Sequence, residues 1–192
     1  MMKFFLKRNY SLCHEFFKES KNYILIAVGI FFITAIIGFI FPIFFREEIS
    51  NLILEMIKML EGKTGLEIMV MIFFNNMKAS FLAMALGIGL GIFPIIAGIV
   101  NGYILGFVSR EVVSSEGILV MWQLLPHGVF EIPAILLSIG IGIKIGGGFF
   151  AKDFKKITKR NLQEGFRFFC FVIFPLLLIA GIIEGLLIVL VS

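Results

Sequence analysis

The chain has 192 residues, of which 59% are hydrophobic and only 16% charged, and it carries a net charge of +4. A soluble domain is nearer about 45–50% apolar and about 25% charged. The composition therefore excludes a soluble monomer and a disordered chain, and two cysteines exclude a disulfide-stabilised secreted scaffold. The sequence predicts an all-α polytopic membrane protein, with residues 1–192 forming a single membrane domain.

Apolar runs long enough to cross a bilayer, whose hydrocarbon core takes about 20 helical residues, occur at five places along the chain. The predicted transmembrane helices are 24–45, 68–89, 92–109, 117–143 and 168–192. The run 68–109 is too long for one crossing, and three glycines and a proline between Gly87 and Pro94 predict a turn. Residues 68–109 are therefore expected to form a tight hairpin of two helices.

Lysine and arginine gather in two segments, 1–22 and 144–167, whereas the segment 46–67 holds more acidic than basic residues. Basic residues accumulate beside the cytoplasmic ends of membrane helices. This pattern predicts a multi-pass plasma-membrane protein with a cytoplasmic N-terminus, a basic cytoplasmic loop at 144–167 and an external C-terminus. No basic stretch carries a nucleic-acid-binding motif, so a nucleic-acid partner is not expected.

Two segments outside the spans have the periodicity of amphipathic surface helices. In the outer loop 46–67 the apolar residues at helical spacing are Ile49, Leu52, Ile53, Met56, Ile57 and Leu60. In the cytoplasmic segment 1–22 they are Leu6, Tyr10, Cys13 and Phe17. Each helix is expected to lie on membrane lipid or to dock a partner protein.

Small and helix-breaking residues mark two of the predicted spans. In the third span Gly98, Gly102 and Gly106 form one stripe that allows close packing of a neighbouring helix. In the fourth span Pro126, Gly128 and Pro133 remove or weaken helical hydrogen bonds, which predicts a kinked or re-entrant segment.

Polar side chains recur inside these apolar spans, where such groups usually face the interior of the bundle. Counting helical rise from the predicted ends, we expect an intramembrane polar cluster in one layer. Its members are Asn75, Asn76, Lys78, Asn101, His127, Glu131 and Glu184, with Glu131 deepest.

Three roles for this cluster remain open: a hydrogen-bonded network that sets helix register, a polar path for a small solute, or a metal or hydrolytic site. The last role would use His127 with Glu131 or Glu184. One histidine with carboxylates is a weak zinc pattern, and no H-E-x-x-H motif is present. No catalytic residues, metal ligands or cofactor are therefore assigned.

The segment from Leu125 to Ala134, which reads Leu-Pro-His-Gly-Val-Phe-Glu-Ile-Pro-Ala, resembles the signature of the stage II sporulation protein M (SpoIIM) family. Phe74-Asn75-Asn76, Asn101-Gly102 with Gly106, and Ile183-Glu184 agree with the same family and occur in the same order. The resemblance covers most of the chain, from about the first span to the end. It implies an inner-membrane protein without recognised catalytic activity, whose namesake localises peptidoglycan-degrading partners during engulfment in sporulation.

We therefore expect a non-enzymatic integral membrane scaffold or complex subunit, with protein partners or self-association as a homo-oligomer, and no soluble substrate. Two alternatives are a small permease or channel subunit that uses the polar layer, and an intramembrane metal-dependent hydrolase.

Overall fold

The computed structural model describes residues 2–118 and 121–191, and it describes the side chains of these residues except those of 2, 121–127, 184, 185 and 187–191. The secondary structure in these residues is helical. The α-helices are α1 (Met2–Ile40), α2 (Arg46–Leu60), α3 (Gly65–Ala85), α4 (Ile92–Glu116), α5 (Met121–Gly147), α6 (Phe154–Phe168) and α7 (Phe174–Val191). Short 3-10 turns follow α3 and α5, and a π-helical turn (Phe169–Ile173) joins α6 to α7.

Five helical segments are long and apolar enough to cross a membrane, so the prediction of about five transmembrane helices is confirmed. They are Lys3–Ile40, Gly65–Ile88, Ile92–Glu116, Gly128–Phe150 and Phe154–Ile183. The chain is thus an all-α, multi-pass membrane protein.

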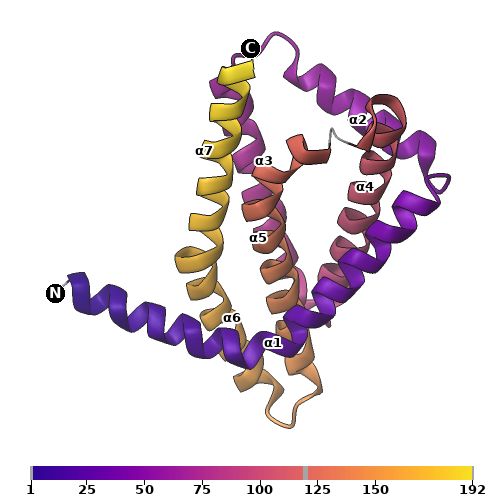
Figure 1. Ribbon diagram of the computed structural model, residues 1–192. Helices are drawn as coiled ribbons and strands as arrows, with labels where there is room; N and C mark the ends of the chain where they lie inside the picture. The colour runs from indigo at the N-terminus through magenta and orange to yellow at the C-terminus, as the bar shows by residue number, and fades with distance from the viewer. Residues whose placement is uncertain (1, 119–120, 192) are drawn as a thin grey trace.

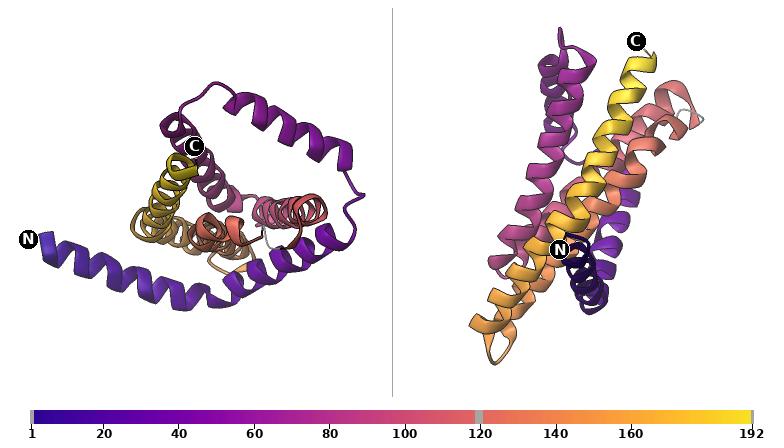
Figure 2. Two further views of the ribbon diagram at one scale, coloured as in Figure 1. Left: turned by 45° about the horizontal axis from the view of Figure 1, so that its top comes forward. Right: turned by 90° about the vertical axis from the view of Figure 1, so that its left-hand side faces the viewer.

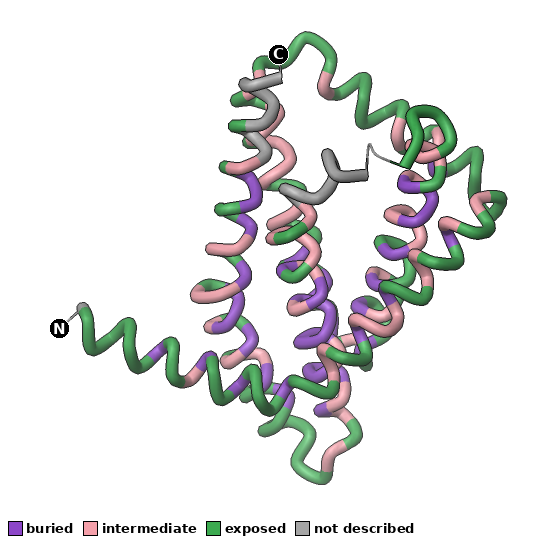
Figure 3. The backbone as a smooth tube through the Cα atoms, in the orientation of Figure 1, coloured by how far each residue is buried: buried purple, intermediate pink, exposed green. Residues whose placement is uncertain are grey.

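The bundle has α5 at its centre, with α1 and α4 on one side and α3 and α7 on the other (Figure 1). Helix α2 crosses outside the bundle, from the end of α1 to the start of α3 (Figure 2). Buried residues concentrate where α5 meets its neighbours, toward the α6 end (Figure 3). At the α2 end the helices diverge, and their surfaces there are largely exposed.

Helix α1 is a single helix of 39 residues, although residues 1–22 were expected to form a surface segment apart from the first span. The run 2–28 contains neither glycine nor proline, so the helix has no cause to break between the two parts. The first half lies across the base of the bundle (Figure 1). There the Phe17 ring stacks on Phe168, and the Tyr10 ring meets Phe171 edge-on.

The hairpin expected within 68–109 is formed by α3 and α4, and the connecting turn is sharp. Leu90 and Gly91 adopt positive φ angles of 58° and 77°, which reverse the chain directly after the 3-10 turn Leu86–Ile88. Helix α4 continues to Glu116, beyond the expected end at residue 109, and it stops at Gly117, where φ is 86°. The charged residues near its end leave the helix intact because none of them is a helix breaker.

The segment 144–167, expected to be a basic loop, is mostly helical. Helix α5 reaches Gly147 and α6 begins at Phe154, so the connection between them is short. Helix α6 then continues through the π-helical turn into α7, so that Phe154–Ile183 forms one helical segment whose charged residues lie in α6 and whose apolar part follows them.

The stripe of Gly98, Gly102 and Gly106 packs against α1 of the same chain. All three glycines are buried. A Cβ atom on Gly102 would meet Thr34 Oγ1 and the Phe31 carbonyl, and one on Gly106 would meet the Ala35 backbone. The two helix backbones are therefore in direct contact, which only glycine permits at these positions.

Candidate functional site

Glycine contacts fix the register of the α3–α4 hairpin against α5. A Cβ atom on Gly142 of α5 would meet the Ala83 carbonyl of α3 and would lie 2.9 Å from Pro94 Cγ of α4. A Cβ atom on Gly146 would collide with the backbone of Gly91, in the turn. Gly142, Ala83 and Pro94 therefore lie at the same height in the bundle and face one another. The height and direction of other residues on α5, α3 and α4 follow from their distance in sequence to these three.

Asn76 lies seven residues before Ala83 on α3, and Asn101 lies seven residues after Pro94 on α4. Both therefore lie toward the α2 end from the contact with Gly142. Seven residues make nearly two full turns and rise about 10 Å, so each asparagine stands almost directly above that contact. Asn76 therefore lies on the α5-facing side of α3 and is half-buried. Asn101 lies on the α5-facing side of α4, is exposed, and donates from Nδ2 to the Ala97 carbonyl oxygen at 2.8 Å.

Glu131 of α5 completes this arrangement. It lies eleven residues from Gly142, which is about three turns and a rise of about 16 Å, so it shares the face that α5 turns to the hairpin. Its side chain is half-buried. Two amides and one carboxyl group, from three helices, therefore lie on the facing sides of α3, α4 and α5, toward the α2 end of the bundle. We call Asn76, Asn101 and Glu131 the inner polar site.

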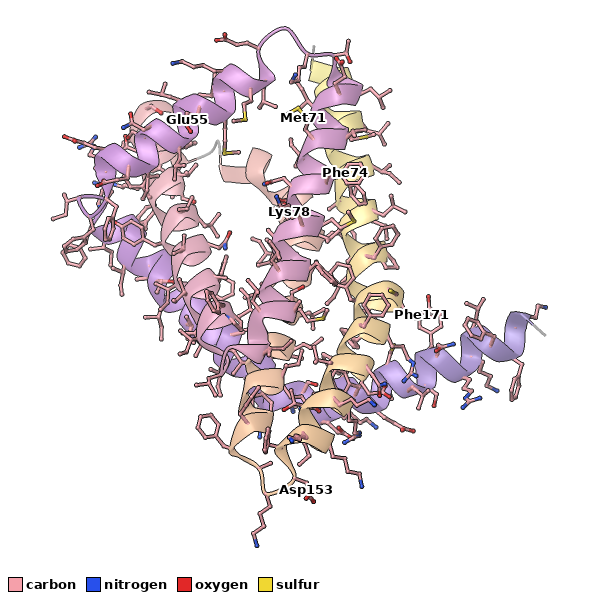
Figure 4. All side chains as sticks on the ribbon, turned by 180° about the vertical axis from the view of Figure 1, so that it is seen from behind. Glu55, Met71, Phe74, Lys78, Asp153 and Phe171 are labelled. Atoms are coloured by element: carbon pink, nitrogen blue, oxygen red, sulfur yellow. The ribbon has the colours of Figure 1, made fainter. Side chains whose placement is uncertain are left out.

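Asn75 and Lys78 do not belong to the inner polar site. Both side chains are exposed; Lys78 lies on the side of α3 turned away from α5 (Figure 4 labels it), and Asn75 points about 80° round the helix from the α5 contact. The described residues of the expected cluster thus fall into two groups, one facing α5 and one facing outward. The side chains of His127 and Glu184 lie outside the described residues.

The backbone of α5 is helical from Met121 to Gly147 and runs without interruption through Pro126, Gly128 and Pro133. His127 is on this helix, four residues before Glu131. Within the part of the chain that the structure describes, no group of three or more His, Cys, Asp or Glu side chains could hold a metal ion.

A second polar cluster, which the sequence reasoning missed, lies at the α6 end. Lys144 of α5 is only 8% exposed, and its Nζ lies 3.2 Å from Glu19 Oε2 and 3.2 Å from Ser20 Oγ on α1. The other oxygen of Glu19 accepts from Arg160 Nη2 of α6 at 2.7 Å. Asn161 Nδ2 donates to the Lys144 carbonyl oxygen at 3.3 Å.

This cluster joins α1, α5 and α6 where the first half of α1 crosses the bundle. Lys144 also lies 4.1 Å from the centre of the Phe16 ring, a cation–π contact. The sequence analysis assigned Lys144 to the basic segment 144–167, which was used to predict the cytoplasmic side of the membrane. The position of Lys144 directly after an apolar run gives no sign of its partner, because Glu19 lies 125 residues away.

Helix α2 has the amphipathic pattern expected of it. It follows Phe45, whose φ is 55°, and the next helix, α3, starts with a capping box between Thr64 and Glu67. An exposed ion pair joins Arg46 Nη2 to Glu111 Oε1 of α4 at 3.3 Å. Within α2, all of which is described, Ile49 alone is buried.

The model of the family described as stage II sporulation protein M matches residues 16–187. The chain belongs to this family. SpoIIM is not a known enzyme family. The match extends over all five candidate membrane helices and includes both polar clusters.

Two relatives from Methanocaldococcus jannaschii are themselves uncharacterised. The protein MJ0706 is 31% identical over 147 residues, which cover 73% of this chain and 63% of the relative. The protein MJ0793 is 38% identical over 73 residues, which cover 37% of this chain and 41% of the relative. This SpoIIM-family chain thus matches less than two thirds of the length of each relative. No solved structure matches the chain.

Proposed function

We propose that this SpoIIM-family chain is a non-enzymatic membrane scaffold that holds partner proteins at the plasma membrane. The SpoIIM resemblance implies such a role for the namesake of the family, which localises peptidoglycan hydrolases in sporulating cells. The process does not follow from membership, so the proposal for this chain is restricted to partner binding.

The observation that carries the proposal is the uncovered apolar face of α2. On this face Leu52, Met56 and Ile57 are each at least half exposed, whereas Ile49 is buried and Ile53 and Leu60 are half-buried. Both ends of α2 are fixed by turns to transmembrane helices, and Arg46 ties its start to α4. A helix held in place with much of its apolar face exposed is suited to binding an apolar surface of another protein.

Cross-linking in the native membrane tests this proposal. A photoreactive residue would replace Met56 on the apolar face, and a matched control would replace Lys155 on the exposed surface of α6. After mild detergent extraction, quantitative mass spectrometry should find one protein cross-linked stoichiometrically through position 56, with Leu52→Ser reducing the yield. Cross-links to lipid alone, or equal yields of the same proteins from position 155, would contradict the scaffold role.

The proposed orientation places the N-terminus and α6 in the cytoplasm and α2 outside, as the distribution of basic residues predicts. A single cysteine introduced at Lys155 or Lys58, in a chain lacking Cys13 and Cys170, distinguishes the two sides. A membrane-impermeant thiol reagent added to intact cells should label position 58 and not position 155. Labelling of position 155 alone would reverse the orientation.

The inner polar site favours a permease or channel subunit as the second candidate. Asn76, Asn101 and Glu131 lie on the facing sides of three helices, and Asn101 is exposed. A solute path there would require water at Asn101 from both sides of the membrane. Reaction of Asn101→Cys with impermeant thiol reagents from both sides would support this function, and protection from both would exclude it.

A further inference from the structure

Lys78 lies at the middle of the membrane-spanning part of α3. The apolar part of this span runs from Ile68, directly after Glu67, to Ile88 in the turn. At 1.5 Å per residue this part is about 30 Å long, which equals a bilayer core, and Lys78 is about 15 Å from either end. A lysine side chain extends only roughly 6 Å, so its ammonium group does not reach either surface.

Lys78 also points away from the helices that pack against α3. On one side Phe73 contacts Gly181 and Phe174 of α7, and on the other Ala83 contacts Gly142 of α5. Lys78 is five residues from Phe73 and from Ala83, and five residues turn a helix by about 500°, or about 140° past one full turn. Its direction therefore lies opposite both contacts, and in Figure 4 Lys78 lies on the side of α3 that faces the opening between α3 and α4, below α2.

No ion pair links Lys78 to the part of the chain that the structure describes. A lysine at the centre of a membrane helix is unfavourable, and such residues pair with another group or face water. Lys78 faces away from the helices that pack against α3, so a group on another molecule is well placed to neutralise it.

The residues around Lys78 form a helix-pairing seam. Met71, Asn75, Lys78 and Leu82 follow one another at intervals of four, three and four residues, which is the spacing of a left-handed coiled coil. Asn75, Lys78 and Leu82 are exposed. Polar residues within such a seam select the partner and the register at a cost in stability.

The charge of Lys78 argues against a second copy of this chain as the occupant of the seam. A two-fold symmetric pair in parallel register would place two Lys78 ammonium groups at one depth beside each other. Like charges repel strongly where the dielectric constant is low. A helix with a carboxylate at the same depth removes this repulsion and neutralises the charge.

We propose that the outward face of α3 docks a transmembrane helix of another protein that carries an aspartate or glutamate near the middle of the bilayer, opposite Lys78. This inference rests on the proposed scaffold function and specifies the chemistry of the partner. The contact joins one ammonium group to one carboxylate between two apolar helices, with Asn75 one turn away as an additional donor.

Designed transmembrane helices test the docking point without a known partner. The probes are leucine–alanine host helices with Glu, Gln, Lys or Leu at the central position, so the central residue has the same depth in either orientation. The full chain would be reconstituted with each host in phosphatidylcholine vesicles, and association would be measured by energy transfer. The Glu host should associate about tenfold more strongly than the Leu host, because interhelical polar contacts in membranes contribute about 1–2 kcal/mol in model peptides.

Variants of the chain locate the effect. Lys78→Gln should remove the preference for the Glu host over the Gln host, and Lys78→Glu should transfer the preference to the Lys host. Lys63→Gln, in the loop before α3, is the matched control and should keep the wild-type preference. Helical content and thermal unfolding should be unchanged in Lys78→Gln, which shows that the loss is not a loss of fold.

Equal association of the Glu and Leu hosts with the wild-type chain would overturn the proposal, as would an undiminished Glu preference in Lys78→Gln. Cross-linking at Met56 in native membranes distinguishes failure of the Lys78 docking point from failure of the scaffold role. A partner recovered equally with wild-type and Lys78→Gln chains would refute the docking point and leave the scaffold role intact. Absence of any partner at α2 would refute the scaffold role, while the vesicle measurement still decides whether Lys78 recruits a carboxylate.

Discussion

Substitution of Gly106 by alanine tests the idea that direct backbone contact holds α4 against α1. A Cβ atom at position 106 would lie 2.8 Å from the Ala35 carbonyl carbon and 2.8 Å from the Phe39 nitrogen, and closer still to the Ala35 carbonyl oxygen. These are backbone atoms of a regular helix, so they cannot rotate away as a side chain would. The two helices must move apart over several residues to accept one methyl group.

The size of the effect follows from two opposing contributions. Overpacking a tight contact costs about 1–3 kcal/mol, and the clash with backbone places Gly106→Ala in the upper part of this range. Alanine favours the helix over glycine by about 1 kcal/mol. The free energy of unfolding should therefore fall by about 1–2 kcal/mol, which lowers the melting temperature by several degrees in a chain of this size.

Thermal unfolding in one detergent, followed by circular dichroism, measures the difference. Gly29→Ala on α1 is the matched control, because a Cβ atom there would have nothing within 4 Å. Gly29→Ala should leave the melting temperature unchanged or raise it. A melting temperature for Gly106→Ala at or above the wild-type value would show that the helix contact is looser than the structure indicates.

Three further substitutions address other parts of the fold, each measured by the same unfolding assay. Lys144→Ala should lower stability by about 1–3 kcal/mol because it removes a buried group that joins α5 to Glu19, whereas exposed Lys155→Ala should not; equal effects would argue against the cluster. Thr64→Ala removes the capping box of α3 and should cost about 1 kcal/mol, with Thr64→Ser restoring it; no loss would refute the cap. Arg46→Ala breaks an ion pair whose groups are both largely exposed, so the change should stay below about 1 kcal/mol, and a larger loss would mean that α2 is held chiefly by this pair.

The number of membrane helices could be predicted from the sequence because it depends on a local property. A run of apolar residues without charge must enter the bilayer, and a run twice as long must turn. The turn between Gly87 and Pro94 was also predictable, because glycine and proline act on their own backbone. The positive φ at Gly91 suits glycine, whereas the positive φ at Leu90 is not indicated by its residue type.

The helix ends were harder to predict, because a charged residue ends the apolar core without ending the helix. Arg110 and Glu111 lie inside α4, and α1 continues through Lys18 and Lys21. A residue can be helical without lying in the membrane. The predicted spans were bounded by charged residues, so they marked the apolar part of each helix and not its ends. The same error moved the expected depth of Asn101, whose helix extends further toward the α2 end than predicted.

The sequence predicted the depth of the polar residues but not the direction in which each side chain points around its helix. Helical rise predicts that Asn75, Asn76 and Lys78 lie at similar depth, and this holds for any packing of the helices. Asn75 and Asn76 are adjacent, yet they point about 100° apart, so one faces outward and the other faces α5. Which of the two is inside depends on contacts such as Ala83 with Gly142, which join residues distant in the sequence.

Because some of the polar residues face α5 and others face outward, we expect substitutions in the two groups to affect folding and partner binding differently. The residues of the inner polar site lie on facing sides of three helices of one chain, so folding of the chain alone sets their positions. Lys78 faces outward and forms no ion pair with the described residues, so under the proposed docking its charge is neutralised by a carboxylate of another molecule. A substitution at Lys78 should therefore change which helix binds without changing the fold. In contrast, a substitution at Gly106 changes the fold before any partner is present.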